Sequence, residues 1–213
     1  MSQLLKPTAV TRIEAAGPDA WILFWNREWE FRAGQVVALG LGGEQRLYSL
    51  ATGTADHEAG VLFNLVPDGL LTPRLAGLAP GGTVYVSDPF GSFLDGPGEA
   101  VWIANGTGVA PFLSMLLSGL EKGKTLIHGA RTRPQFYGHE TASALLGSAY
   151  VRCASADEGE GLFSGRLTAY LDGRDWPDRP YYLCGSAAMI VEARDILIRR
   201  GVSYHRILSE VYF

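Results

Sequence analysis

The sequence predicts two domains of different fold class, an N-terminal antiparallel β-barrel and a doubly wound parallel-sheet domain. Residues 1–97 contain short apolar strands separated by glycine- or proline-rich turns, which is typical of an antiparallel barrel. Residues 98–213 alternate strands with helices, which indicates a parallel sheet with helices on both faces. The turn-rich stretch Asp95–Gly98 marks the expected boundary.

The expected barrel strands are rich in branched and aromatic residues. They lie at 20–25, 35–39, 46–50, 61–66 and 83–86, and one short helix is expected at 72–78. Trp21, Trp25 and Trp29 recur every fourth residue, which favours an aromatic barrel wall over a binding surface.

The second domain is expected to alternate strand and helix to its end. Its strands are expected at 101–104, 125–128, 150–154, 181–184 and 204–209. Its helices are expected at 110–120, 140–146, 167–171 and 187–200, the last ended by a glycine.

The composition indicates a globular protein with a packed core, because 47% of the 213 residues are hydrophobic and 19% are charged. A net charge of −4 argues against nucleic-acid binding. Two cysteines provide neither a disulfide framework nor the ligands of an iron–sulfur centre. The four histidines show no metal-ligand spacing, so no metal is expected. Without a signal peptide or a spanning segment, we expect a cytoplasmic protein.

Two glycine-containing turns each follow a strand and open a helix. In Gly106–Pro111 the helix start offers free N–H groups to a pyrophosphate, although proline replaces the sixth residue of the common dinucleotide fingerprint. In Leu183–Met189 the cysteine and glycine reach the same sheet edge. An ordinary strand-to-helix turn and a small buried cysteine are the alternatives.

Two further segments carry aromatic residues at informative places. In Arg46–Ser49, Arg46 and Tyr48 share one face of a strand, where they can hold a phosphate and stack on a flat ring. The chain ends on Tyr212-Phe213 directly after an apolar strand, which indicates that these rings are docked. A surface arginine, a barrel tyrosine and docking on the protein's own core are the alternatives.

Together these motifs resemble, in order and over nearly the whole chain, the ferredoxin–NADP reductase family of flavoproteins. The segments that carry the resemblance are Arg46–Ser49, Pro67–Thr72, Asp88–Phe93, Gly106–Pro111, Cys184–Met189 and Glu210–Tyr212.

The resemblance implies two sets of cofactor-binding residues. The flavin set is Arg46, Leu47, Tyr48, Ser49, Asn64, Leu65, Val66, Leu71, Thr72, Tyr212 and Phe213. The nicotinamide-nucleotide set is Gly106, Thr107, Gly108, Pro111, Arg131, Ser155, Asp157, Arg166, Cys184, Gly185 and Met189.

The catalytic residues implied are Ser49, Cys184, Glu210 and Tyr212. Tyr48 would pack on one face of the flavin, and Tyr212 or Phe213 would cover the other and move aside for the nicotinamide. Ser49 would hydrogen-bond near flavin N5. Cys184 would press against the nicotinamide, and Glu210 would polarise it or relay protons.

The nucleotide preference is left open by one departure from the family. Members that use NADPH often place Ser-Arg where this chain has Ser155-Ala156-Asp157. A carboxylate there favours a ribose 2′-hydroxyl and repels a phosphate. Arg131, Arg133 and Arg166 on neighbouring loops supply positive charge. Mainly from the family resemblance we expect NADP, with NAD as the alternative.

The resemblance implies an FAD-dependent reductase that transfers hydride between NAD(P)H and flavin and exchanges single electrons with ferredoxin or flavodoxin. A free-flavin reductase, the reductase component of an oxygenase and a non-catalytic nucleotide-binding subunit are the alternatives, and FMN is the alternative to FAD. Arg194, Arg199 and Arg200 form either a solvated helix face or a docking patch for an acidic electron carrier.

Overall fold

The computed structural model describes residues 4–212, which form two compact units. The first unit contains the described chain up to Asp95 together with Ala110–Ser118. The second contains Gly96–Val109 and the chain from Gly119 onward. The helix that follows the first glycine turn therefore belongs to the first unit, although the turn itself belongs to the second.

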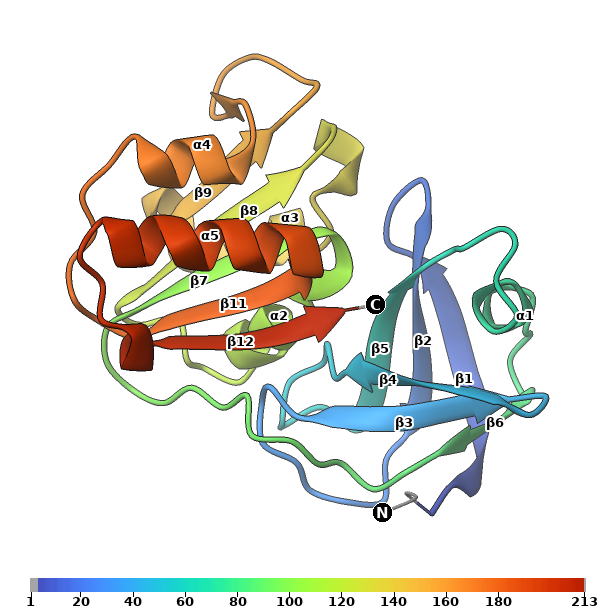
Figure 1. Cartoon of the computed structure of the whole chain (residues 1–213). Coiled ribbons are helices and arrows are strands. Elements are labelled where there is room, and N and C mark those ends of the chain that lie inside the picture. Colours follow the sequence, from blue (N-terminus) through green and yellow to red (C-terminus); the bar gives the residue numbers. More distant parts are fainter. Residues whose placement is uncertain (1–3, 213) are drawn as a thin grey trace. The chain divides into compact units, whose positions relative to one another are not determined.

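The first unit is an antiparallel six-stranded barrel (Figure 1). Its strands are β1 (Lys6–Ala15), β2 (Ala20–Asn26), β3 (Val36–Leu41), β4 (Glu44–Ser49), β5 (Glu58–Asn64) and β6 (Thr83–Val86). Their order is β4-β3-β6-β1-β2-β5, and an antiparallel bridge between Leu50 and Val61 joins the two outer strands. The predicted antiparallel barrel is confirmed.

Strand β1 was not predicted, and its burial explains why. Its first half, Lys6–Ala9, pairs with β6, whereas its second half pairs with β2 from Val10 onward, with a register shift between Val10 and Arg12. Only Val10 of this strand is buried. The segment therefore shows no apolar alternation, which is the signal that sequence reading depends on.

The core of the first unit forms where the strand faces meet. Trp25, Leu39, Leu50 and Phe63 are buried there, and Leu75 of the short helix α1 (Thr72–Ala76) packs with them. Of the three tryptophans of the expected aromatic wall, Trp25 is 1% exposed, and Trp21 and Trp29 pack against the core half-buried.

Helix α2 (Ala110–Leu117) is fastened to the barrel loops by polar and aromatic contacts within the first unit. Ser114 Oγ donates to the carbonyl oxygen of Thr52 at 2.7 Å. The ring of Phe112 meets that of Phe93 edge-on, with 5.8 Å between the ring centroids. The helix ends three residues before the predicted 120, and the glycine that follows has a φ of +79°.

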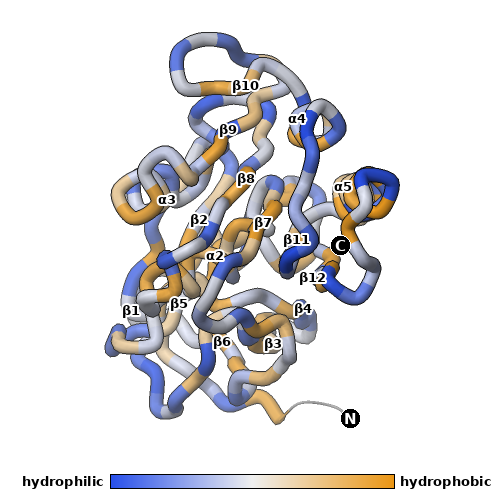
Figure 2. The backbone as a smooth tube through the Cα atoms, turned by 90° about the vertical axis from the view of Figure 1, so that its left-hand side faces the viewer, coloured by the Kyte–Doolittle hydropathy of each residue, from blue (hydrophilic) through white to orange (hydrophobic). Residues whose placement is uncertain are grey.

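The second unit is a parallel six-stranded sheet in the order β10-β9-β8-β7-β11-β12. Its strands are β7 (Ala100–Asn105), β8 (Lys124–Ala130), β9 (Tyr150–Ala154), β10 (Phe163–Ser164), β11 (Tyr181–Ser186) and β12 (Ile207–Tyr212). Helices α4 (Leu167–Asp172) and α5 (Ala187–Arg199) cover one face and α3 (His139–Leu146) covers the other (Figures 1 and 2). The predicted doubly wound sheet is confirmed.

The core of this sheet is apolar along the central strands, which Figure 2 shows as orange segments. Ile103, Ile127 and Leu183 are fully buried on β7, β8 and β11, and Leu197 of α5 packs with them. Such continuous apolar strands are typical of a parallel sheet covered on both faces.

The last strand is displaced from its prediction. Residues Tyr204–Arg206 form a 3₁₀ helix, and β12 runs from Ile207 to Tyr212 instead of 204–209. Parallel pairing with β11 continues through Ser186 and Tyr212, which carries the strand to the end of the described chain. Glu210 and Tyr212 are therefore strand residues.

Two glycines with positive φ give a test of packing against backbone strain in the barrel unit. Gly34 has a φ of +97°, and an added Cβ would overlap the carbonyl oxygen of Phe93. Gly81 has a φ of +87°, with nothing within 4 Å of that position. We expect Gly81→Ala to cost about 1 kcal/mol of unfolding free energy, which is the backbone penalty alone. Gly34→Ala should cost at least about 3 kcal/mol, measured by urea unfolding. Equal losses would contradict the packing at Gly34.

Candidate nucleotide and flavin sites

The second unit contains one point where its strand order reverses. From β7 the chain proceeds outward to β8, β9 and β10, whereas β11 and β12 lie on the opposite side of β7. Ala104 and Cys184 are partners in the β7–β11 register, so both strands end at the same edge. Ligands of doubly wound sheets bind outside the carboxyl ends of the strands at such a switch point.

The two predicted glycine turns meet at this point. An added Cβ on Gly108 would overlap the carbonyl oxygen of Cys184 and lie 2.6 Å from Cα of Gly185. Gly185 has a φ of +144°, which L side chains rarely adopt. The close approach of two backbones therefore requires glycine at both positions.

Asn105 joins the two turns through its side-chain amide. Its Oδ1 accepts from Ser186 N at 2.9 Å, and its Nδ2 donates to Ser186 Oγ at 3.1 Å. Ser186 is the N-cap of α5, and its Oγ accepts from Met189 N at 3.4 Å. The end of β7 is thereby fixed to the start of α5.

Strand β12 brings Glu210 and Tyr212 to the same edge, where Cys184 pairs with Glu210 and Ser186 with Tyr212 in the parallel register. Burial raises the pKa of the Cys184 thiol well above its usual value, and the Glu210 carboxylate raises it further. A hydrogen bond to Tyr212 acts in the opposite direction. Cys184 is therefore a neutral thiol that provides a small packing surface, not a nucleophile.

His128 lies fully buried in β8, under the first glycine turn. Its Nδ1 is 3.0 Å from the Tyr150 hydroxyl, and its ring meets Phe136 edge-on at 5.2 Å. Burial lowers the pKa of His128 to about 3, and the charge of His139 acts in the same direction, whereas the Gly106 backbone favours the protonated ring. The Nε2 atom forms no hydrogen bond of acceptable geometry within the described chain. This histidine is neutral and structural at ordinary pH.

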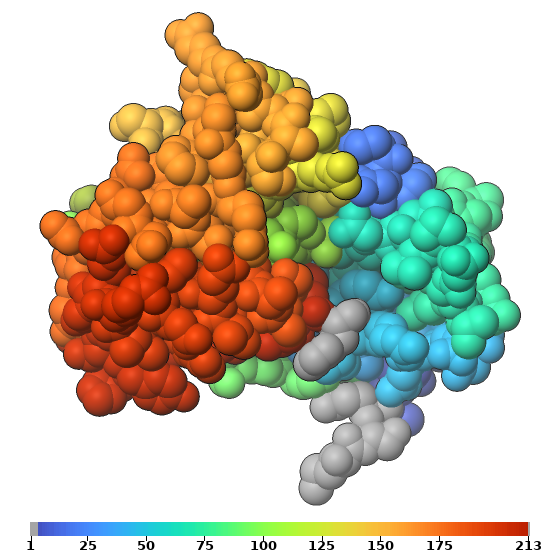
Figure 3. All heavy atoms as spheres, turned by 45° about the horizontal axis from the view of Figure 1, so that its top comes forward, coloured from blue at the N-terminus to red at the C-terminus, as the bar shows by residue number. Residues whose placement is uncertain are grey.

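The loops after β8 and β9 are joined at the same edge. Asp157 Oδ2 accepts from the backbone N of Arg133 at 2.6 Å, and Arg133 Nη2 donates to the Glu158 carbonyl at 3.1 Å. Ser155 N donates to Ala130 O at 3.1 Å. The segment between β9 and α4 projects from the surface of the second unit (Figure 3). Asp157 thus holds one loop against the other with one of its carboxylate oxygens.

The arginines on and beside α4 and α5 are paired with carboxylates. Arg166 Nη2 is 2.6 Å from Glu192 Oε2, and Arg199 Nη2 is 2.8 Å from Asp172 Oδ1. Arg200 reaches the same Asp172, and Arg194 pairs with its neighbour in sequence. These pairs favour a solvated helix face over a docking patch.

In the first unit, β4 presents the Arg46–Ser49 segment. Tyr48 is half-buried and meets Phe63 edge-on at 6.4 Å. Burial raises the pKa of Tyr48 to about 12, with the Arg46 charge opposing the shift. The phenol stays protonated and its ring is held in place. Leu47, between them, is 58% exposed, and Arg46 is also exposed.

The loop after β5 is closed on itself next to this strand, because the Leu50–Val61 bridge joins β4 to β5. Thr72 Oγ1 accepts from Val66 N at 2.9 Å, and Asn64 Nδ2 donates to Asp19 O at 3.2 Å. Leu71 is buried, whereas Val66 is exposed. The backbone N–H groups of Leu65, Val66 and Gly69 thus donate within the first unit and fix the shape of the loop.

Known proteins share both the sequence pattern and the fold. Residues 102–195 match the oxidoreductase NAD-binding domain family. A Ralstonia protein named as the ferredoxin–NAD(P)+ reductase component of naphthalene dioxygenase and salicylate hydroxylase systems is 32% identical over 86% of this chain and 61% of its own length. The chain thus spans about three fifths of that relative. A Methanopyrus kandleri protein named as the probable electron transfer subunit of dihydroorotate dehydrogenase B is 30% identical over 89% of this chain and 68% of its own. The chain belongs to the ferredoxin–NADP reductase family.

The fold of this ferredoxin–NADP reductase family member agrees with that assignment. A Neisseria gonorrhoeae ferredoxin–NADP+ reductase, solved with FAD and NADP bound, superposes with a TM-score of 0.90 at 19% identity and covers 100% of both chains. The resemblance predicted from the motifs is confirmed at the level of the family. Within residues 4–212, no helix is both long and apolar enough to cross a membrane.

The structure brings together part of the predicted residue sets. Gly106, Thr107, Gly108, Cys184, Gly185, Glu210 and Tyr212 meet at one edge of the second unit. Arg46–Ser49 and the 64–72 loop are neighbours in the first unit. Pro111 lies in α2 and so belongs to the first unit. Phe213 lies outside the described residues. The ligand-binding and catalytic roles of all these residues stay predictions.

Sequence reading missed the hydrogen bonds by which Asn105 and Ser186 join the two turns. Asn105 resembles any turn residue, because its two partners are 81 positions away. The N-cap character of Ser186, directly before the last helix, was the available signal.

The buried His128 predicts a pH dependence of stability. Its folded pKa of about 3 lies below the unfolded value of roughly 6.5, so the unfolded chain takes up the proton first as the pH falls. Stability that is present above about pH 6.5 is therefore lost toward pH 3. Between about pH 7 and pH 5 the wild type should lose about 2 kcal/mol more than His128→Gln in urea unfolding followed by circular dichroism. His57→Gln, at an exposed barrel position, is the control and should keep the wild-type slope. Equal slopes for His128→Gln and wild type would refute a buried neutral imidazole.

Proposed function

We propose that this chain is an FAD-dependent oxidoreductase that transfers hydride between NAD(P)H and flavin and exchanges single electrons with ferredoxin or flavodoxin. The observation that carries the proposal is the contact between Gly108 and Cys184 at the strand-order switch point. Because of that contact, the sheet edge where a nucleotide would bind is formed by the backbone of the two glycine turns. The barrel unit adds a strand with the sequence that the family uses for flavin.

The residues of the barrel unit fit a flavin dinucleotide. The protonated, half-buried ring of Tyr48 offers a flat apolar face, and the exposed Arg46 offers a cation for a phosphate. The 64–72 loop, whose Val66 N–H is bonded to Thr72, would bind the pyrophosphate through its remaining backbone N–H groups. When bound, FAD supplies the exchange between two-electron and one-electron transfer.

The residues of the second unit would position the nicotinamide nucleotide. Gly106–Val109 and the N-terminus of α5 present backbone N–H groups at one edge, suited to a pyrophosphate. The neutral Cys184 would limit how far the nicotinamide ring enters the site, without reacting with it. Glu210 would orient the carboxamide of the nicotinamide. Tyr212 would act as an aromatic lid, and Ser49 would hydrogen-bond near flavin N5. Binding and orientation, not acid–base strength, are the contributions of the protein.

A second candidate function is that of the reductase component of an oxygenase. It is favoured by the Ralstonia relative, which is named as the reductase component of such systems and is longer than this chain. Ferredoxin as the electron acceptor and the cytoplasm as the compartment stay predictions.

The test of the function uses the purified chain. After FAD is added and the unbound FAD is removed, flavin absorbance should remain with the protein. Anaerobic NADPH or NADH should bleach this bound flavin. Steady-state rates with ferredoxin, with flavodoxin and with free flavin then separate the candidate acceptors. A protein that takes up no flavin would refute the enzyme proposals and leave the non-catalytic nucleotide-binding subunit.

Asp157 provides the test of nucleotide preference. One carboxylate oxygen holds the Arg133 backbone, so the charge stays at the edge where a ribose 2′-substituent would lie. Asp157→Asn keeps an acceptor for that backbone but removes the charge. We expect kcat/KM for NADPH relative to NADH to rise about fivefold, as removal of one close like charge predicts. Glu160→Gln, on the same exposed loop, is the matched control and should leave the ratio unchanged. An unchanged ratio in Asp157→Asn would place Asp157 away from the ribose.

A further inference from the structure

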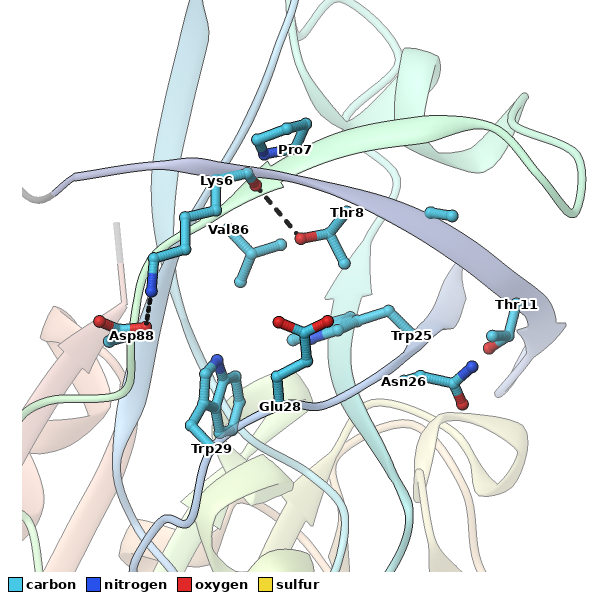
Figure 4. A pocket seen from close by; sticks show the side chains of 11 residues that line it. Lys6, Pro7, Thr8, Thr11, Trp25, Asn26, Glu28, Trp29, Val86 and Asp88 are labelled. Carbon is cyan, nitrogen blue, oxygen red and sulfur yellow. Dashed lines mark hydrogen bonds and ion pairs between the residues drawn. The ribbon is translucent and has the colours of Figure 1, made fainter.

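The barrel unit contains a pocket that the proposed function does not use. It lies between the first half of β1, the segment after β2 and the end of β6, and it has a volume of about 480 Å³. Figure 4 shows the side chains that line it, among them Lys6, Thr8, Trp25, Glu28, Trp29 and Asp88. We call it the β1 pocket.

The pairing of β1 explains why the pocket is open. Residues Lys6–Ala9 pair with β6, and pairing with β2 begins only at Val10, so the chain after Trp25 diverges from β1. Pro7 lies in this half of the strand and has no N–H to offer an added strand. The opening therefore suits a compact ligand better than an extended peptide.

Two indoles form the apolar part of the β1 pocket. Trp25 is almost fully buried and belongs to the barrel core, and Trp29 is half-buried and held edge-on by Phe31 at 6.0 Å. Figure 4 shows the Glu28 side chain extending from the segment after β2, with its carboxylate directed toward the side of the pocket where Thr8 and Val86 lie. Indole faces next to a carboxylate attract a cation with an apolar stem.

The polar groups of the pocket are complementary to a cation. Lys6 Nζ is bonded to Asp88 Oδ1 at 2.8 Å, which neutralises both at the rim. Glu28 forms no hydrogen bond or ion pair with any residue from 4 to 212, so the lining is net negative. Thr8 Oγ1 already donates to the Lys6 carbonyl at 3.2 Å, which leaves its lone pairs to accept. An anionic ligand would be repelled by Glu28, whereas an N–H donor finds acceptors there.

We propose that the β1 pocket binds an organic cation with N–H donors, of the alkylammonium or guanidinium class, with Glu28 as its counter-ion and Trp29 as its aromatic wall. The volume fits a small ligand with an apolar stem. The site is independent of the nucleotide and flavin residues, none of which lines it.

The test follows the indole N–H signal of Trp29 in ¹H–¹⁵N NMR spectra of the full chain, assigned with Trp29→Phe. Butylammonium and butylguanidinium are the two probes of the class, and butyltrimethylammonium and butanol lack the donors or the charge. We expect saturable shifts with one or both probes of the class and weak or no shifts with the other two. Glu28→Gln should weaken binding by at least about tenfold. Glu30→Gln, the control, removes an exposed carboxylate of the same segment that lies outside the pocket and should leave affinity within about twofold.

Three results would overturn the proposal. One is the absence of a saturable shift with either probe up to tens of millimolar. Another is equal weakening by Glu28→Gln and Glu30→Gln, which would show a non-specific charge effect. The third is binding of butanol or butyltrimethylammonium as tight as that of the tighter-binding of the two class probes. Because Glu28 lies outside the proposed catalytic machinery, Glu28→Gln should also keep the wild-type melting temperature and NAD(P)H oxidation rate.

Discussion

The contact between the backbones of Gly108 and Cys184–Gly185 is the constraint on which the nucleotide edge depends. β7 and β11 are neighbours in the sheet. The turn after β7 approaches the end of β11 so closely that a Cβ on Gly108 would overlap the carbonyl oxygen of Cys184. Asn105 then joins the end of β7 to the N-cap of α5. Backbone N–H groups from two turns are thus held at one place, which a pyrophosphate ligand requires.

Three ionisable groups near the predicted sites, Cys184, Tyr48 and His128, are kept in their neutral forms. Burial is the largest cause of the raised pKa values of Cys184 and Tyr48 and of the lowered pKa of His128. None of the three presents a charge that would compete with the charge of a bound cofactor. Such an environment favours chemistry that the cofactor performs and the protein positions.

Much of the fold could be predicted because its signals are local. Apolar strands, glycine turns and the helix start at Ser186 are each encoded within a few residues. Strand β1 could not be found, because it divides its pairing between two partners and buries only Val10. The two-residue strand β10 lies at a sheet edge and has too few residues to show a period.

The predicted sites were found as motifs, but the contacts that build them were not. The pairing of Asn105 with Ser186 and the position of His128 beside Tyr150 depend on residues far apart in the chain. The same holds for Asp157, whose charge suggested ribose recognition although one of its oxygens holds a neighbouring loop. Motif spacing reports which residues reach an edge, whereas their partners are fixed by the register of the parallel strands.

Helix α2 has a consequence for how the chain can be divided. It lies beyond β7 in sequence, yet Ser114 bonds to Thr52 and a Cβ on Gly53 would lie 2.7 Å from the Leu117 carbonyl oxygen. A gene fragment that stops at the turn-rich stretch near Asp95 would encode all six barrel strands and still omit this helix. The loops that it covers would then face water. Isolation of the barrel therefore calls for a circularly permuted or grafted design that restores residues 110–118, not a simple truncation.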